Sequence, residues 1–260
     1  MELALGGQRS DAVSAENQVK LTNLGIQGLE FVLGGGLPED SVYLLTGIPG
    51  TYYITFAQQA IYGHLVKRGK AVYYTSETAS TEIVQDMELY GWDIRSYIDD
   101  GSLVFARPLP PALQSFVGMM PHVPNEEFVD LTSSELGGLT KDFISRIKEE
   151  RWSILNLSYL MNQYSAQKIS DLMLFWVNAV HKYGGVHFVL MLEGAHDEKQ
   201  VTFLKNIADG VFNFKFGNGF GQSEGEVEVQ KLRRVVPKSK VFRHIVQSDG
   251  LAIETTARIG

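Results

Sequence analysis

The stretch T-G-I-P-G-T-Y-Y-I, which runs from Thr46 to Ile54, decides the fold because it has the frame of a phosphate-binding loop. Such a P-loop reads G-x-x-x-x-G-K-[ST] and lies between a strand and a helix. Gly47 begins the motif directly after the apolar run Ser41–Leu45, which predicts the strand. The residues in place of the closing Gly, Lys and Ser/Thr are Tyr52, Tyr53 and Ile54.

The loop has lost its charge in any register, because no Lys or Arg occurs between Lys20 and Lys67. P-loops hold polyphosphate through backbone N–H groups, the lysine ammonium and a hydroxyl on Mg²⁺. Only a glycine-containing turn at a helix N-terminus remains, so we expect no cofactor beyond weak binding of ATP or phosphate. The residues of this degenerate nucleotide site are Gly47, Ile48, Pro49, Gly50, Thr51, Tyr52 and Tyr53.

The composition is that of a globular protein with a large core, since the 260 residues are 44% hydrophobic and 20% charged. The net charge of −7 argues against strong non-specific binding to DNA or anionic membranes. The absence of cysteine excludes disulfides, thiolate catalysis and cysteine metal sites. Residues 1–18 contain no apolar segment long enough for a signal peptide, so we predict a cytoplasmic protein. None of the six histidines has the spacing of a metal ligand, so we predict no metal site.

Strand-like and helix-like segments alternate from residue 19 onward, which predicts a mostly parallel sheet. The expected parallel strands are 41–45, 71–75, 103–106, 153–157 and 187–192. The expected helices are 53–67, 81–89, 140–149 and 166–182. Short runs at 211–216, 226–233, 241–246 and 251–255 predict an antiparallel extension at one edge of the sheet. We interpret residues 107–135 as a long excursion and residues 1–18 as a flexible arm before one domain, residues 19–260.

Three phrases occur in a fixed order around the loop. The first, residues 24–40, reads L-G-I-Q-G-L-E-F-V-L-G-G-G-L-P-E-D, the second is Glu77 followed by Gly91-Trp92-Asp93, and the third is Lys231-Leu232-Arg233. Together they resemble the KaiC-like branch of the RecA-superfamily ATPases, of the archaeal RadA-paralogue type. The resemblance implies an α/β fold of the RecA-like P-loop NTPase kind, with a mostly parallel central sheet and antiparallel C-terminal edge strands.

The same resemblance shows what is missing. The family ends its fourth core strand in an Asp that orders Mg²⁺, whereas no carboxylate occurs here between Glu150 and Asp171. Glu77 matches the first of two paired glutamates, the one that activates water, and Thr78 replaces the second. Phosphoryl transfer depends on charge compensation around phosphate and metal. Degenerate Walker A and Walker B motifs therefore predict that Glu77 is a relic and that no residue is catalytic.

Several side chains keep two interpretations. We predict that Tyr52 and Tyr53 fill the vacated phosphate pocket, and stacking on a planar ligand such as adenine is the alternative. Asp197 is predicted to cap a helix rather than to form a metal cluster with His196. No sequence signal provides a base for a serine nucleophile, so we predict no hydrolase triad.

A basic strip lies near the C-terminus of this acidic chain, formed by Lys231, Arg233, Arg234, Lys238, Lys240 and Arg243. Lys231 and Arg233 match family residues that reach the γ-phosphate of the neighbouring subunit, and family members assemble by placing one subunit's edge against the next one's nucleotide site. We therefore predict that these two residues contact a partner. A solvent-exposed strip and a nucleic-acid contact are the alternatives.

The function predicted from these observations is that of a catalytically inactive KaiC/RecA-like pseudo-ATPase that acts through protein or peptide interaction. The expected partner is another copy, a paralogous RecA/KaiC-like subunit or an extended peptide segment. Two alternatives stay open: a nucleotide-binding regulatory switch without hydrolysis, and a DNA-associated accessory protein of recombination or repair. Nucleotide titration separates the first alternative, and salt-dependent DNA binding separates the second.

Overall fold

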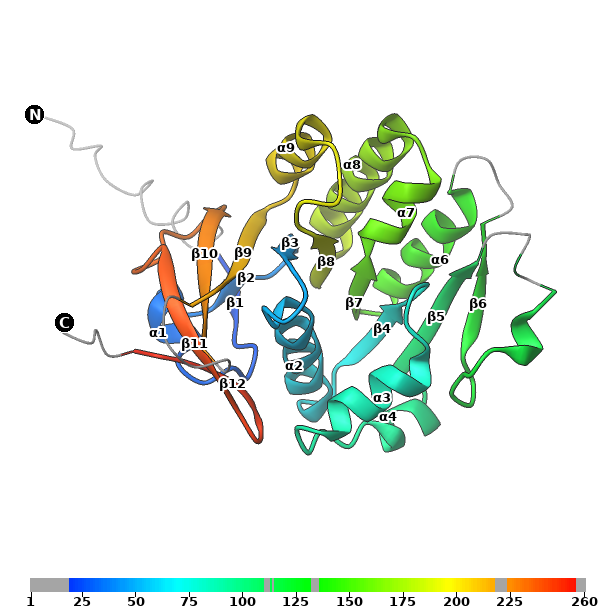
Figure 1. Ribbon diagram of the computed structural model, residues 1–260, viewed down its shortest axis with the longest axis horizontal. Coiled ribbons are helices and arrows are strands. Elements are labelled where there is room, and N and C mark those ends of the chain that lie inside the picture. The colour runs from blue at the N-terminus through cyan, green and yellow to red at the C-terminus, as the bar shows by residue number, and fades with distance from the viewer. Residues whose placement is uncertain (1–18, 110–112, 114, 132–135, 218–223, 256–260) are drawn as a thin grey trace, which may run out of the picture.

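The computed structural model describes residues 19–109, 113, 115–131, 136–217 and 224–255. Within them lies a ten-stranded sheet in the order β12-β11-β10-β9-β3-β8-β7-β4-β5-β6, with helices on both faces (Figure 1). The predicted α/β fold, with a mostly parallel sheet and antiparallel strands at one edge, is confirmed. The predicted arm, residues 1–18, lies outside the described residues.

All five predicted parallel strands form. They are β3 (Ser41–Gly47), β4 (Lys70–Tyr74), β5 (Leu103–Leu109), β7 (Arg151–Asn156) and β8 (Val186–Leu192). The predicted helices are α2 (Tyr53–Val66), α3 (Ser80–Glu88), α6 (Gly137–Lys148) and α8 (Ala166–Tyr183). Because parallel strands end at one edge of the sheet, the loops after β3, β4, β7 and β8 meet where open α/β sheets bind ligands.

Alternate side chains of each central strand enter two cores, one on each face of the sheet. In β3, Tyr43 and Leu45 join the core that contains α2 and α3, and Val42 and Leu44 join the core that contains α6 and α8. Strands buried on both faces are continuous apolar runs. This is why the sequence pattern located them.

The C-terminal part differs from the prediction at one strand. β9 (Gly210–Phe216) pairs in parallel with β3 and antiparallel with β10 (Glu224–Leu232), so it completes the parallel sheet rather than the extension. β11 (Val241–Gln247) and β12 (Gly250–Ile253) follow in antiparallel pairing. At the outer edge, the backbone of Ile253 donates to the carbonyl of Gln27 at 2.8 Å.

The predicted excursion over residues 107–135 is partly wrong. β5 continues to Leu109, and β6 (Glu127–Asp130) adds a parallel strand beside it. A buried ion pair anchors the connection, because Arg107 Nε donates to Glu126 Oε1 at 2.6 Å and the two side chains are 6% and 0% exposed. Ser80, the first residue of α3, donates to the second carboxylate oxygen. The network therefore fastens this connection to α3.

Other elements were not predicted: α1 (Leu29–Leu33), α4 (Arg95–Asp99), α7 (Leu157–Gln163), the 3₁₀ turn Val117–Met119, and the pair β1 (Leu21–Thr22) and β2 (Leu37–Pro38). The helix start predicted at Asp197 is confirmed, because its side chain accepts from the backbone N–H groups of Lys199 and Gln200 at the start of α9 (Glu198–Ile207). The glycine-rich phrase serves close packing, since a Cβ on Gly36 would lie 2.4 Å from the carbonyl of Thr22.

Candidate functional site

The loop of residues 48–52 leaves β3 at the edge where the parallel strands end. The N–H and the Oγ1 hydroxyl of Thr51 both donate to the carbonyl of Ile48, at 3.2 and 2.7 Å, and close the turn. Gly50 has φ 87, and a Cβ there would lie 3.3 Å from the ring of Phe216. The mouth of the loop thus faces an aromatic ring from the end of β9.

Tyr52 stands where the P-loop motif has its closing glycine. Its backbone has the left-handed conformation, with φ 64, directly before α2. This conformation costs a residue with a side chain about 1–2 kcal/mol, whereas glycine adopts it freely. The ring is half-buried and meets the ring of His244 edge-on, with 6.0 Å between the centroids. The backbone of a glycine site is therefore kept although a phenol ring is attached to it.

Tyr53 stands at the lysine position and is only 8% exposed. A Cβ on Gly47 would lie 2.8 Å from Cδ1 of this ring, so the ring packs on the start of the loop. Burial, and after it the charge of Glu77, raises the pKa of the phenol. The structure thus makes Tyr53 a packing residue, whereas the half-buried Tyr52 keeps part of its ring in contact with solvent.

Asn156 ends β7, the fourth of the five predicted parallel strands in chain order. Its Nδ2 donates to a carboxylate oxygen of Glu77, and its Oδ1 accepts from the N–H of Ser158 at 3.1 Å and caps α7. Partial burial raises the pKa of Glu77, and the bond from Asn156 opposes this shift. The carboxylate of Glu77 therefore lies at the expected sheet edge, held by a neutral amide.

The structure brings together Ser158 and His196, which no sequence signal connected. Ser158 Oγ lies 3.0 Å from Nε2 of His196 and accepts from the N–H of Leu192 at 2.8 Å. Burial lowers the pKa of His196, so the ring is neutral at pH 7. Since Ser158 is only 5% exposed and bonded on both sides, this pair fastens α7 to the loop after β8. It gives no support to a nucleophile.

A second polar chain crosses the same edge of the sheet. Thr46 Oγ1 donates to Asn213 Oδ1, and Asn213 Nδ2 donates to Glu193 Oε1, both at 3.1 Å. These bonds join β3, β9 and the loop after β8. The carboxylate of Glu193 is therefore satisfied by an amide, as that of Glu77 is.

Lys231 and Arg233 bind their own chain. Nζ of Lys231 donates to the carbonyls of Lys205 and Asn206, at 3.3 and 2.5 Å, and so caps the C-terminus of α9. Burial, and then the charge of Arg233, lowers the pKa of Lys231. Arg233 Nη1 lies 3.3 Å from Oδ1 of Asp209. A contact with a partner would have to replace these bonds.

Two further findings concern the described ranges, residues 19–255 with their gaps. No three His, Cys, Asp or Glu side chains there are grouped so that they could hold a metal ion. No helix in the same ranges has the length and apolarity needed to cross a bilayer.

The model of an ATPase family described as KaiC matches residues 22–258. The chain belongs to the KaiC ATPase family. Among its KaiC relatives, the circadian clock oscillator protein KaiC of Acaryochloris marina is 30% identical over 255 residues, which cover 92% of this chain and 45% of that protein. A UPF0273 protein of Methanopyrus kandleri is 31% identical over 137 residues, or 52% of this chain and 53% of that protein.

A solved structure agrees with the fold of this KaiC-family chain. The crystal structure of a KaiC-like protein from the archaeon Pyrococcus horikoshii has a TM-score of 0.68, at 19% identity, over 91% of this chain and all of the other. The chain spans about half or less of the length of the curated relatives it matches. The predicted KaiC resemblance is thus confirmed, and the RadA-paralogue type and the loss of activity stay predictions.

Proposed function

We propose that this KaiC-family chain is a pseudo-ATPase that does not hydrolyse ATP and acts through contact with another protein chain. The observation that supports this most directly is the burial of Tyr53, in place of the lysine, against Gly47. Asn156 ends β7 with an amide rather than a carboxylate, and this amide donates a hydrogen bond to Glu77. Removing one charge-stabilising contact typically lowers an enzymatic rate by ~10²–10³. The combined loss of lysine, hydroxyl and metal carboxylate leaves no rate to measure.

We expect the purified chain to show no steady-state ATPase activity above background and no binding of Mg·ATP at millimolar concentration. The triple variant Tyr52→Gly/Tyr53→Lys/Ile54→Thr should not regain hydrolysis, because a carboxylate is still absent at Asn156. Phosphate release and calorimetric titration measure both quantities. A wild-type rate that disappears in Glu77→Gln would contradict the proposal. Tight ATP binding without turnover would favour the regulatory switch instead.

A set of exposed apolar side chains around the loop supports the contact with another chain. We call this the loop face: Ile48, Ile54, Leu89 and Phe216, which are 39%, 38%, 79% and 56% exposed. Phe216 packs on Gly50, and Ile54 and Leu89 line the same pocket beside the loop. Contiguous exposed apolar surface marks contact sites. The proposed occupant is another copy, a paralogous KaiC-like subunit or an extended peptide segment.

Charge on the loop face should weaken such a contact. We expect Leu89→Lys to lower association with another copy or with a KaiC-like paralogue by about 5- to 30-fold, the range of a buried contact residue. Val236→Lys is the matched control, because Val236 is 88% exposed but lies on the loop after β10. Sedimentation velocity over a concentration series measures association. Equal behaviour of the two variants, or a wild type that stays monomeric with every KaiC-like chain, would refute this contact.

A further inference from the structure

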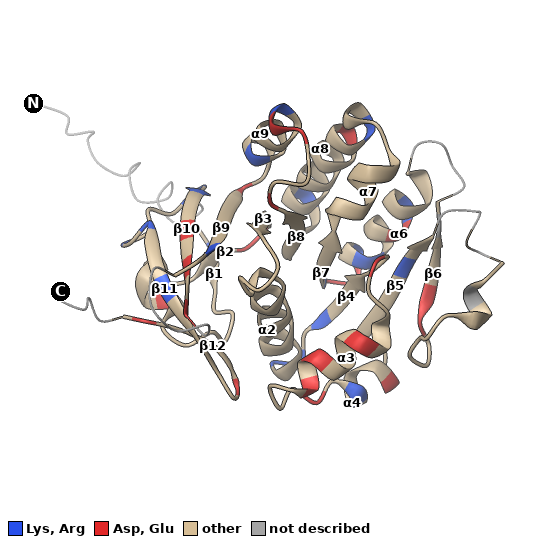
Figure 2. Cartoon of the chain, in the orientation of Figure 1, with Lys and Arg blue, Asp and Glu red and all other residues tan. Residues whose placement is uncertain are grey.

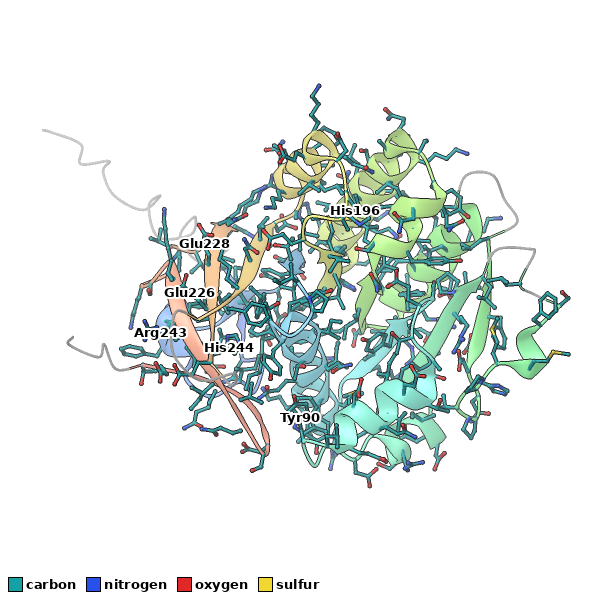
Figure 3. All side chains as sticks on the ribbon, in the orientation of Figure 1. Tyr90, His196, Glu226, Glu228, Arg243 and His244 are labelled. Atoms are coloured by element: carbon teal, nitrogen blue, oxygen red, sulfur yellow. The ribbon has the colours of Figure 1, made fainter. Side chains whose placement is uncertain are left out.

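A pocket of about 370 Å³ lies beside the loop, between the first turns of α2 and the C-terminal end of α3. Three tyrosines line it: Tyr52 and Tyr53 from the start of α2, and Tyr90 from the segment after α3. Asp86 and Gln58 add a carboxylate and an amide. Figure 3 shows Tyr90 beside α2 and away from His196.

The charge around this pocket is negative. Asp86 has no basic partner within the described ranges. Partial burial, followed by repulsion from Glu82, raises its pKa, as expected for a carboxylate without a cation beside it. Glu77 adds a second negative charge near the pocket, where it raises the pKa of Tyr53. Figure 2 shows acidic positions on α3 and no basic position on the first turns of α2.

The rings around the pocket are held in place and uncharged. Tyr90 stacks on Trp92 with 4.8 Å between the ring centroids, and Tyr52 is held edge-on against His244. Burial raises the pKa of Tyr90, so its phenol stays neutral. Burial lowers the pKa of His244 to about 4, so this ring is also neutral at pH 7 and does not repel a cation.

We propose that this pocket binds an organic cation, the guanidinium or ammonium head of an arginine or lysine side chain or of a free amine with the same chemistry. Aromatic faces attract such cations when these lie within about 6 Å, and a nearby carboxylate adds to the attraction. The charge of the proposed ligand is thus opposite to that of the phosphate held by a P-loop. The loop of active ATPases holds an anion through a lysine, whereas the pocket beside the loop of this chain is lined by three tyrosines and a carboxylate and, among the described residues, by no Lys or Arg.

A nucleotide base is the competing occupant, because rings also stack on planar bases. A base fits less well, since Asp86 and Glu77 repel the phosphates attached to it and no Lys or Arg is among the described residues that line the pocket. The inference deepens the proposed function, because it names the chemistry by which a partner segment is held. It can fail independently, since cation binding is measured without any reference to hydrolysis.

The test is a titration of the full chain, followed by NMR of its tyrosine ring protons. Acetyl-arginine amide should shift these signals, whereas the neutral isostere acetyl-citrulline amide and the planar anion AMP should not. Acetyl-Gly-Arg-Gly amide distinguishes the sources of the cation. Binding at least tenfold tighter than that of acetyl-arginine amide assigns the pocket to a peptide side chain, and equal binding assigns it to a free amine.

Two substitutions in the pocket and one control outside it check the residues. Asp86→Asn should weaken binding of acetyl-arginine amide by about 2- to 5-fold, as expected for an ion pair close to solvent. Glu82→Gln, on the same helix but outside the pocket, should change it less than twofold. Tyr90→Leu should cost a similar 2- to 5-fold. Equal binding of arginine and citrulline amides, displacement of arginine amide by AMP, or an unchanged affinity in Asp86→Asn would each overturn the proposal.

Discussion

Replacement of Arg107 by methionine is expected to lower the free energy of unfolding by about 3–5 kcal/mol. The reason is the position of Glu126, whose side chain is completely buried and accepts from Nε of Arg107 at 2.6 Å. Without the guanidinium this carboxylate is a buried charge whose only partner among the described residues is the hydroxyl of Ser80. Urea unfolding followed by circular dichroism measures the loss.

Two controls separate the ion pair from the packing of Arg107. The double variant Arg107→Met/Glu126→Leu should recover most of the loss, because it removes both charges from the interior. Arg95→Met should unfold at nearly the same urea concentration as the wild type, since its pair with Glu88 is exposed to solvent. If Arg107→Met unfolds at the same urea concentration as the wild type, the buried pair does not anchor this connection.

This network lies at one end of the helix whose other end forms the cation pocket. Glu126 binds Ser80, the first residue of α3, and Asp86 and Tyr90 come from the end of α3 and the segment after it. The buried pair therefore sets the start of the helix that carries two of the proposed binding residues. Loss of stability and loss of cation affinity should accordingly occur together in Arg107→Met.

Sequence patterns predicted the strands that are buried on both faces, because continuous apolar runs such as Ser41–Leu45 have no other simple explanation. They missed β6, a four-residue strand at the edge of the sheet with an exposed Phe128. They also assigned β9 to the antiparallel extension, because a strand that pairs in parallel on one side and antiparallel on the other has no distinct periodicity.

The site was predictable only where it follows one continuous stretch. The departures from the P-loop motif at Tyr52, Tyr53 and Ile54 are visible in the sequence alone. The place of Asp86 and Tyr90 in the pocket could not be predicted from the sequence. These residues come from α3 and the segment after it, and only the fold brings them to the loop. The internal bonds of Lys231 were hidden for the same reason, since its acceptors lie at the end of α9.

The second large effect is expected at the loop itself, where Tyr53→Ala should cost about 3–5 kcal/mol of unfolding free energy, as for other buried aromatic side chains. Tyr53 is 8% exposed, and its ring packs on Gly47. Tyr53→Phe keeps the ring and should cost less than about 1.5 kcal/mol. An unchanged thermal melt of Tyr53→Ala would show that this ring does not stabilise the loop.

Tyr52 offers a comparison in which the backbone and the side chain act in opposite directions. Its ring is half-buried, so Tyr52→Ala should cost less than Tyr53→Ala, and Tyr52→Gly should be more stable than Tyr52→Ala by about 1 kcal/mol. That order reverses the usual preference for alanine over glycine, because the residue has φ 64. Finding Tyr52→Gly to be the less stable of the two in urea would mean that residue 52 does not keep this left-handed conformation in solution. The chain would then have lost the glycine geometry of a phosphate loop together with its lysine, whereas the expected order would show that it lost the lysine and kept the turn.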